Sequence, residues 1–234
     1  GNNFSKIVFS GRSDLKFTDA FIAAYPQSIE DRLNAIKASH PDVEELSPNE
    51  EYELKSSTFE VLPYVFHNEI PQHEENYYKL LGLISGKRTC RWIEKKYMTP
   101  RYADNNIAKY KVFVPESNGS GTLGEVLSTP LVAQPDFSST PTFISIGCFG
   151  TEKEALNALK YIKTKFVRIL LGILKKTQHN PASTWAYVPM QNFTDTSQID
   201  WDLPIADIDT QLYKKYNLSI EDIDFIEKTA VSMD

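Results

Sequence analysis

The residues best suited to chemistry in this chain are positively charged side chains that gather in one stretch of sequence. Residues 79–111 hold nine Lys and Arg against two Asp and Glu, whereas the whole chain of 234 residues has a net charge of −6. Residues 1–78 and 179–234 are both acidic. A charge distribution of this kind indicates a local surface for a polyanion. The alternative is that the acidic ends fold back and neutralise the basic middle.

Within the basic stretch, the spacing predicts a β-hairpin. YYKLLGLI (77–84) and KRTCRWIEKKYM (87–98) flank Ser85-Gly86, and glycine readily adopts the positive φ of a two-residue turn. Strand alternation places Arg88 and Trp92 on one face of the second arm and Arg91 on the other. Cations on both sides of a tryptophan suit phosphates and bases. An edge strand protected by its charges is an equally good interpretation.

Two further segments could approach an anion. A strand predicted at 109–115 runs into Glu-Ser-Asn-Gly-Ser-Gly (116–121), and glycines in such a loop allow backbone N–H groups to come close to a ligand. The loop is not a nucleotide-binding P-loop, because no Gly-Lys-Ser/Thr follows it. The second segment is the basic end, 175–179, of a long predicted helix.

We expect these segments to contact DNA, with basic side chains gripping phosphates and setting register. Asn can bond adenine through two hydrogen bonds and Arg can do the same to guanine, so Asn118 and Arg91 are candidate base readers. Gln178 and His179 are secondary candidates. The full set is Lys87, Arg88, Arg91, Lys95, Lys96, Arg101, Lys109, Lys111, Ser117, Asn118, Ser120, Lys175, Lys176, Gln178 and His179.

The elements that would position these residues indicate the α+β class. Thr151 and Glu154 form a capping-box start for one helix over 151–179, which is about 40 Å long at about 1.5 Å per residue. We expect it to back a small antiparallel or mixed β-sheet. Further strands are predicted at 127–135, 140–149 and 185–191, an extended segment at 58–70, and helices at 28–39, from Asp202 to about Tyr216, and from Ser219 onward.

This pattern predicts a domain over residues 1–200, with an acidic loop at about 40–57, and a helical C-terminal tail over 201–234. The sequence offers little support for a nuclease site, a metal site or a catalytic cysteine. Glu94-Lys95-Lys96 and Pro41-Asp42 only imitate the two halves of a nuclease magnesium site, and the four histidines lack the paired spacing of a metal site. Two isolated cysteines predict a reducing, cytoplasmic location without catalytic thiols. No stretch predicts a membrane span.

Residues 109–229 resemble the C-terminal target-recognition region of N6-adenine DNA methyltransferases from restriction–modification systems, especially the type IIG kind. The resemblance lies in KYKVFVPESNGSGTLGEVLSTPLVAQP, the run from TFISIGCFG to KKTQH, WAYVPMQNFT, IDWDLPIADIDTQLYKKYNLS and EDIDFIEK. FEVLPYVFHNE and LLGLISGKRTCRWI are similar to the segment that precedes it in such proteins. Where relatives often have Gly before Leu-Ser, this chain has Asn217.

The resemblance implies sequence-specific recognition of double-stranded DNA without catalysis in this chain. The adenine methyltransferase motif Asn/Asp-Pro-Pro-Tyr/Phe is missing, because Asn180-Pro181 continues as Ala182-Ser183. S-adenosylmethionine, and Mg²⁺ if a nuclease is fused, would belong to the parent protein, whose catalytic methyltransferase domain would be the partner. We read Gly1 as a cloning remnant on a piece of a longer protein. The alternative is a protein-interaction module or a specificity subunit of a restriction–modification complex.

Overall fold

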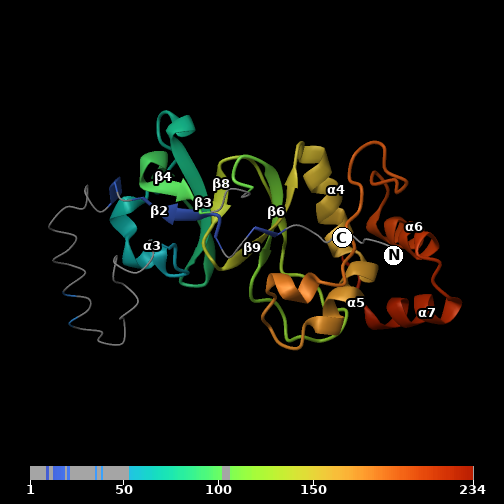
Figure 1. The fold of residues 1–234 in the computed structure, drawn as a ribbon. Helices are drawn as coiled ribbons and strands as arrows, with labels where there is room; N and C mark the ends of the chain where they lie inside the picture. Colours follow the sequence, from blue (N-terminus) through green and yellow to red (C-terminus); the bar gives the residue numbers. More distant parts are fainter. Residues whose placement is uncertain are drawn as a thin grey trace. The chain divides into compact units, whose positions relative to one another are not determined.

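The computed structural model describes residues 9–10, 13–18, 20–21, 35, 38, 53–101 and 106–233 (Figure 1). The chain divides into two compact units. Unit 1 comprises Gly1–Arg12, Ala108–Pro135 and Thr142–Asp234, and unit 2 comprises Ser13–Ile107 and Asp136–Pro141. The C-terminal helices therefore belong to unit 1, together with residues 108–135 and 142–204.

Unit 1 is built on a four-stranded antiparallel sheet with strand order β1-β9-β6-β7. Val112 in β6 lies opposite Ile146 in β9, and both side chains are buried in the core of unit 1. Val114 and Ile144 join them in this core, so these four residues mark the face of the sheet that packs in the core of unit 1. The strands are β1 (Phe9–Ser10), β6 (Tyr110–Pro115), β7 (Leu131–Ala133) and β9 (Phe143–Phe149).

The single helix predicted over 151–179 is wrong, because the structure has two helices there. α4 (Glu152–Lys163) and α5 (Lys165–Leu174) meet at Thr164, whose ψ of 150° is not helical. The Thr164 hydroxyl accepts a hydrogen bond from the Val167 N–H and donates one to the Tyr161 carbonyl. Thr164 therefore ends one helix and caps the next, a local competition that apolar periodicity does not reveal.

A buried carboxylate fixes this break. Asp209 accepts hydrogen bonds from the backbone N–H groups of Lys165, at 3.0 Å, and Phe166, at 2.9 Å. These donors belong to the first turn of α5, where no intrahelical acceptor exists and negative charge is favoured. Asp209 comes from α6 (Ile205–Lys215), so the break depends on tertiary packing.

The C-terminal part of unit 1 completes its core. The Tyr161 ring lies 5.9 Å from Trp201 and 5.7 Å from Phe193 between ring centroids. α6 begins after Pro204 instead of Asp202, whereas α7 (Ile220–Thr229) starts at the predicted Ser219–Asp222 capping box. The strand predicted at 185–191 is wrong. A 3-10 helix, η5 (Ala182–Trp185), leads instead into turns, which bury the Trp185 ring.

Unit 2 contains the predicted hairpin. β3 (Tyr77–Ile84) and β4 (Lys87–Glu94) pair antiparallel through Ser85 and Gly86, whose φ values are 49° and 76°. β8 (Phe137–Ser139) adds to β3 in parallel, giving the order β4-β3-β8, with β4 at the edge. The strand ends at Glu94, so the following residues lie in a turn. The remaining elements are β2 (Leu15–Phe17), β5 (Met98–Pro100), α3 (Thr58–Val61), η2 (Pro63–Val65), η3 (Glu74–Asn76) and η4 (Lys95–Tyr97).

The first part of the segment 58–70 is not extended as predicted, because its residues form α3 and η2, whereas Phe66 is extended and the His67 backbone pairs with that of Trp92. Phe59 and Phe66 pack edge to face at 5.0 Å and join fully buried Leu80 and Ile93 in a core of unit 2. The predicted α+β class is confirmed, although the strands of the described residues form three small sheets. The helix predicted at 28–39 and most of the acidic loop at 40–57 lie outside the described residues. Among the helices described, none has the length and apolarity to cross a membrane.

Candidate nucleic-acid interface

The first candidate surface is the outer part of the hairpin in unit 2. Lys87 and Arg88 are exposed, and Arg91 is partly exposed. Register places Lys87 opposite Ile84, Arg88 opposite Leu83 and Arg91 opposite Leu80. One Nη of Arg91 donates to the Cys90 carbonyl at 3.1 Å, which orients the guanidinium while leaving other N–H groups for a ligand.

The tryptophan of this strand does not offer a stacking platform, which corrects the sequence-based expectation. Trp92 is only 7% exposed, and its backbone pairs with His67. Lys79 in β3 covers it, with Nζ 5.6 Å from the Trp92 ring centroid and 4.6 Å from that of Phe137. Lys79 was not among the predicted residues, because only the β3–β8 pairing brings Phe137 beside it.

Three other predicted cations of unit 2 already have carboxylate partners. Lys95 pairs with Asp136 at 2.7 Å, Lys96 with Glu94, and Arg101 with Glu53. The hydrogen bond to Glu94 raises the pKa of the exposed Lys96. The Lys95 and Lys96 pairs are partly exposed, and ion pairs at the surface contribute little to stability, so a phosphate can replace the carboxylate there at small cost. At Arg101 the partner comes from the acidic segment, as the fold-back alternative expects.

The second candidate surface is in unit 1, where the structure brings two predicted segments together. The backbone of Ser117 pairs with that of His179, and the Asn118 N–H donates to the Gln178 carbonyl at 2.7 Å. His179 Nδ1 lies 3.3 Å from the Glu116 carboxylate. The exposed members of the predicted set in unit 1 are Lys109, Ser117, Ser120, Lys176, Gln178 and His179.

Asn118 is a structural residue and not a base reader in this structure. It is 3% exposed, its Nδ2 donates to the Val126 carbonyl at 3.0 Å, and its Oδ1 accepts from the Ser128 N–H. The amide therefore uses its acceptor and one donor to shape the loop. The side chain of a loop residue was expected to face outward, and its burial removes it from the DNA-contacting set.

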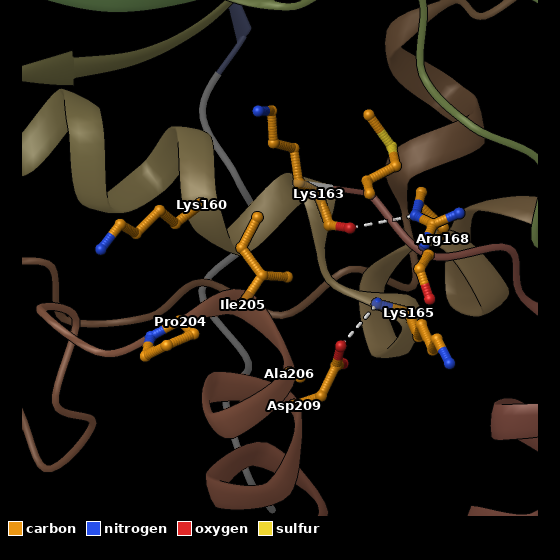
Figure 2. Close-up of a pocket in the computed structure, with 10 residues that line it drawn as sticks. Lys160, Lys163, Lys165, Arg168, Pro204, Ile205, Ala206 and Asp209 are labelled. Carbon is orange, nitrogen blue, oxygen red and sulfur yellow. Dashed lines mark hydrogen bonds between the residues drawn. The ribbon is translucent and has the colours of Figure 1, made fainter.

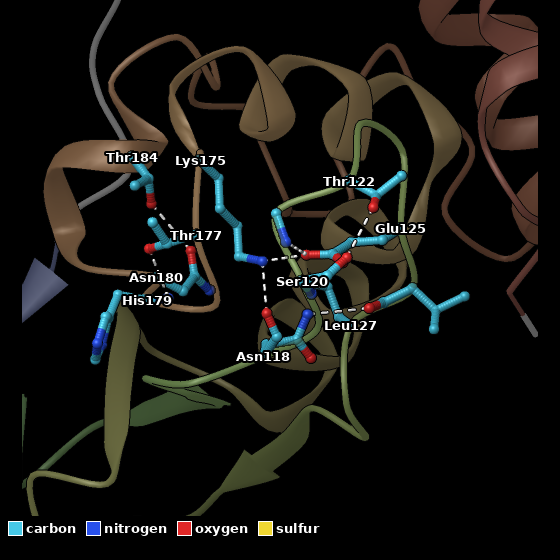
Figure 3. Close-up of polar contacts among 12 residues, drawn as sticks. Asn118, Ser120, Thr122, Glu125, Leu127, Lys175, Thr177, His179, Asn180 and Thr184 are labelled. Atoms are coloured by element: carbon cyan, nitrogen blue, oxygen red, sulfur yellow. Dashed lines mark hydrogen bonds and ion pairs between the residues drawn. The ribbon is translucent and has the colours of Figure 1, made fainter.

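Lys111 and Lys175 also leave the set, because both are buried. Lys111 is fully buried in β6. The Lys175 ammonium, in a side chain that is 2% exposed, pairs with Glu125 and donates to the Asn118 carbonyl at 2.6 Å. Figure 3 shows this ammonium between the Glu125 carboxylate and the Asn118 carbonyl oxygen. The chain leaves α5 at Leu174, which is why Lys175 does not continue a solvated helix face.

The backbone N–H groups of the glycine loop do approach an anion, but the anion is a carboxylate of the same chain. Glu125 accepts from the N–H groups of Ser120 at 2.8 Å and Gly121 at 3.2 Å. Burial alone would raise the pKa of Glu125, but these bonds and the one from Lys175 outweigh it and leave that pKa below its ordinary value. No pattern in the sequence pointed to Glu125 as the anion of this loop.

The two surfaces differ in how open they are. The hairpin has cations exposed to solvent, whereas in the loop of unit 1 the Glu125 carboxylate occupies the position that an external anion would take.

Comparison with protein-family models, with curated proteins and with solved structures found no match to this chain.

Proposed function

We propose that this protein is a sequence-specific recognition domain for double-stranded DNA that contributes no catalytic residues of its own. The observation that carries the proposal is the edge strand β4, where Lys87, Arg88 and Arg91 keep exposed or partly exposed positive groups. A row of cations on a strand can follow a phosphate backbone, and this contact positions a protein on the duplex.

Arg91 is the first candidate for reading a base, through the N–H groups that it does not use for Cys90 and a guanine edge, and Gln178 and His179 stay secondary candidates. Lys95, Lys96 and Arg101 would exchange their carboxylate partners for phosphates. On unit 1, Lys109, Ser117, Ser120, Lys176, Gln178 and His179 form a second group of polar and basic contacts. Lys79 adds a cation to the hairpin surface, held over two aromatic rings.

The resemblance noted in the sequence supports placing this domain in a cytoplasmic restriction–modification enzyme. The parent protein would be an N6-adenine methyltransferase that uses S-adenosylmethionine, with Mg²⁺ needed if an endonuclease is fused. In that setting the target adenine would flip into the catalytic domain of the parent while this domain holds the surrounding duplex.

The direct test is an anisotropy titration of the chain with random-sequence duplex DNA at several salt concentrations. Each phosphate contact contributes about 0.9 to the slope of log affinity against log salt. Reversing the charge at two contacts, in Arg88→Glu/Arg91→Glu, should weaken binding and reduce the slope by about 2. The change follows from two lost phosphate contacts.

The matched control is Lys16→Glu/Lys55→Glu, which changes the net charge by the same amount at two exposed positions of unit 2. If the control weakens binding as much as the hairpin variant does, the effect is one of total charge. If the hairpin variant keeps wild-type affinity and slope, the hairpin is not the contact surface.

A protein-interaction module or specificity subunit is the second candidate, and α7 is the feature that favours it. Ile220 is 82% exposed and Phe225 is 52% exposed on a helix whose other exposed residues are mostly acidic. Large exposed apolar side chains on one helix are typical of protein contacts. Failure of the wild-type chain to bind duplex DNA even at low salt would favour this candidate.

A further inference from the structure

Unit 1 contains a cavity of about 470 Å³ where the α4–α5 break faces the start of α6 (Figure 2). Its volume lies in the range of sites for small molecules, roughly 300–1,000 Å³. The lining residues are Lys160, Lys163, Lys165, Arg168, Pro204, Ile205, Ala206, Asp209, Ser232 and Met233. None of them belongs to the predicted DNA-contacting set.

The lining carries four basic residues and one acidic residue, and the acid is already engaged. Both carboxylate oxygens of Asp209 accept backbone N–H groups of α5. Lys165 pairs with Glu227 at 2.6 Å. The lining therefore holds more basic than acidic residues even when Glu227, the partner of Lys165, is counted with it.

Two of the cations are held by neutral groups. Lys160 Nζ donates to the carbonyls of Trp201, at 2.7 Å, and Leu203, at 3.2 Å. The Arg168 guanidinium, 1% exposed, donates to backbone carbonyls, among them Lys163 at 3.0 Å and Gly124 at 2.8 Å. Carbonyl dipoles solvate a cation without cancelling its charge. Burial lowers the pKa of Arg168, as expected for a charge that is incompletely compensated.

The middle of the cavity is apolar. Figure 2 shows the Ile205 side chain in the centre of the view, with Lys160 on one side and Lys163 and Arg168 on the other. Pro204, Ala206 and Met233 extend this apolar lining. Lysine side chains are flexible, so the rim ammonium groups can turn toward a bound anion. The arrangement suits a ligand that joins an anionic group to an apolar or aromatic body.

We propose that this cavity binds a phosphate group attached to an apolar or aromatic moiety, with the basic rim holding the phosphate and the Ile205 region holding the body. A free nucleoside monophosphate and a nucleotide of a DNA strand share this chemistry. The proposal concerns a site other than the hairpin and does not depend on DNA binding there.

The experiment is isothermal titration of the full chain with AMP and, separately, with inorganic phosphate. Wild-type protein should bind AMP at micromolar to millimolar concentrations and inorganic phosphate more weakly. Ala206→Asp places a carboxylate in the lining and, because Asp is favourable in the first turn of a helix, should leave α6 folded. It should weaken AMP binding at least about tenfold by charge repulsion.

Asn217→Asp is the matched control, because it adds the same charge at an exposed position outside the lining, about 16 Å from Ala206 at about 1.5 Å per residue along α6. It should leave AMP affinity within about twofold of wild type, because that separation exceeds the Debye length of about 8 Å. Lys163→Gln should weaken AMP binding by removing a rim cation. Absence of AMP binding to wild type, or equal affinity in Ala206→Asp and wild type, would overturn the site.

The source of the phosphate is distinguished by competition. If duplex DNA releases bound AMP in wild type and in Arg88→Glu/Arg91→Glu alike, the cavity takes a nucleotide of the strand. If AMP stays bound in the presence of saturating duplex, the ligand is a free organic phosphate. Inorganic phosphate binding as tightly as AMP would contradict the contribution of the apolar lining.

Discussion

The glycine loop of unit 1 and the hairpin of unit 2 use similar residues in opposite ways. In the loop, Lys175 is buried against Glu125 and the backbone N–H groups point at that carboxylate. In the hairpin, Lys87 and Arg88 lie exposed on an edge strand. The comparison teaches that a basic residue near a glycine turn can be an internal counter-ion or an external contact, depending on what packs over it.

The turns themselves show the same contrast. A Cβ added to Gly86, at the hairpin turn, would meet nothing within 4 Å, whereas one added to Gly121 would lie 2.6 Å from the Lys176 carbonyl carbon. The hairpin turn projects into open space. The loop packs closely against the segment that follows α5, and this packing buries the Lys175 ammonium and most of the Glu125 carboxylate.

The largest effect is expected at the buried ion pair. Lys175→Met should lower the free energy of unfolding by about 3 kcal/mol, because Glu125 keeps a mostly buried carboxylate without its cation. Lys87→Met in the hairpin should change it by no more than about 0.5 kcal/mol. Urea denaturation followed by tryptophan fluorescence measures both. Equal small losses would show that the loop pair is as weak as a surface pair.

An intermediate effect is expected at the two glycines. Gly121→Ala combines a φ of 89° with a backbone clash and should cost about 2 kcal/mol or more. Gly86→Ala has a φ of 76° without a clash and should cost about 1 kcal/mol. Thermal unfolding of the two variants tests the order. A larger loss for Gly86→Ala would contradict the tight packing of the loop.

The smallest effect is a pH dependence with opposite signs at two carboxylates of unit 1. The pKa of Glu125 is lower in the folded protein than in the unfolded chain. The charged Glu125 therefore stabilises the fold above the unfolded pKa, about 4.3, and this stabilisation is lost as pH falls through the folded pKa. Burial raises the pKa of Asp209 despite its backbone hydrogen bonds, so its contribution falls as pH rises from about 3.9 through the folded value.

Denaturation between acidic and neutral pH at constant ionic strength measures these contributions. The stability gap between wild type and Glu125→Gln should widen as pH rises across the acidic range. The gap between wild type and Asp209→Asn should narrow over the same range. A parallel response of the two variants would mean that the loop does not stabilise the charged form of Glu125.

Local patterns predicted much of the fold. The Ser85-Gly86 turn, the strands around 110–115 and 143–149, the Thr151 cap and the Ser219–Asp222 capping box all depend on a few neighbouring residues. The failures share a cause in longer-range packing. The apolar periodicity predicted a single helix because the apolar face continues across Thr164. The Asp209 carboxylate that stabilises the break there lies 44 residues beyond Lys165.

The sequence by itself determined the secondary-structure class, the hairpin and the segregation of charge, because propensity, capping and alternation act over short distances. Tertiary structure alone decided which charged and polar side chains reach solvent. Lys111, Asn118 and Lys175 are buried by strands and segments distant in sequence, while Lys87 and Arg88 are left outside. Desolvating a charge requires a partner, and the fold, not the residue type, supplies that partner.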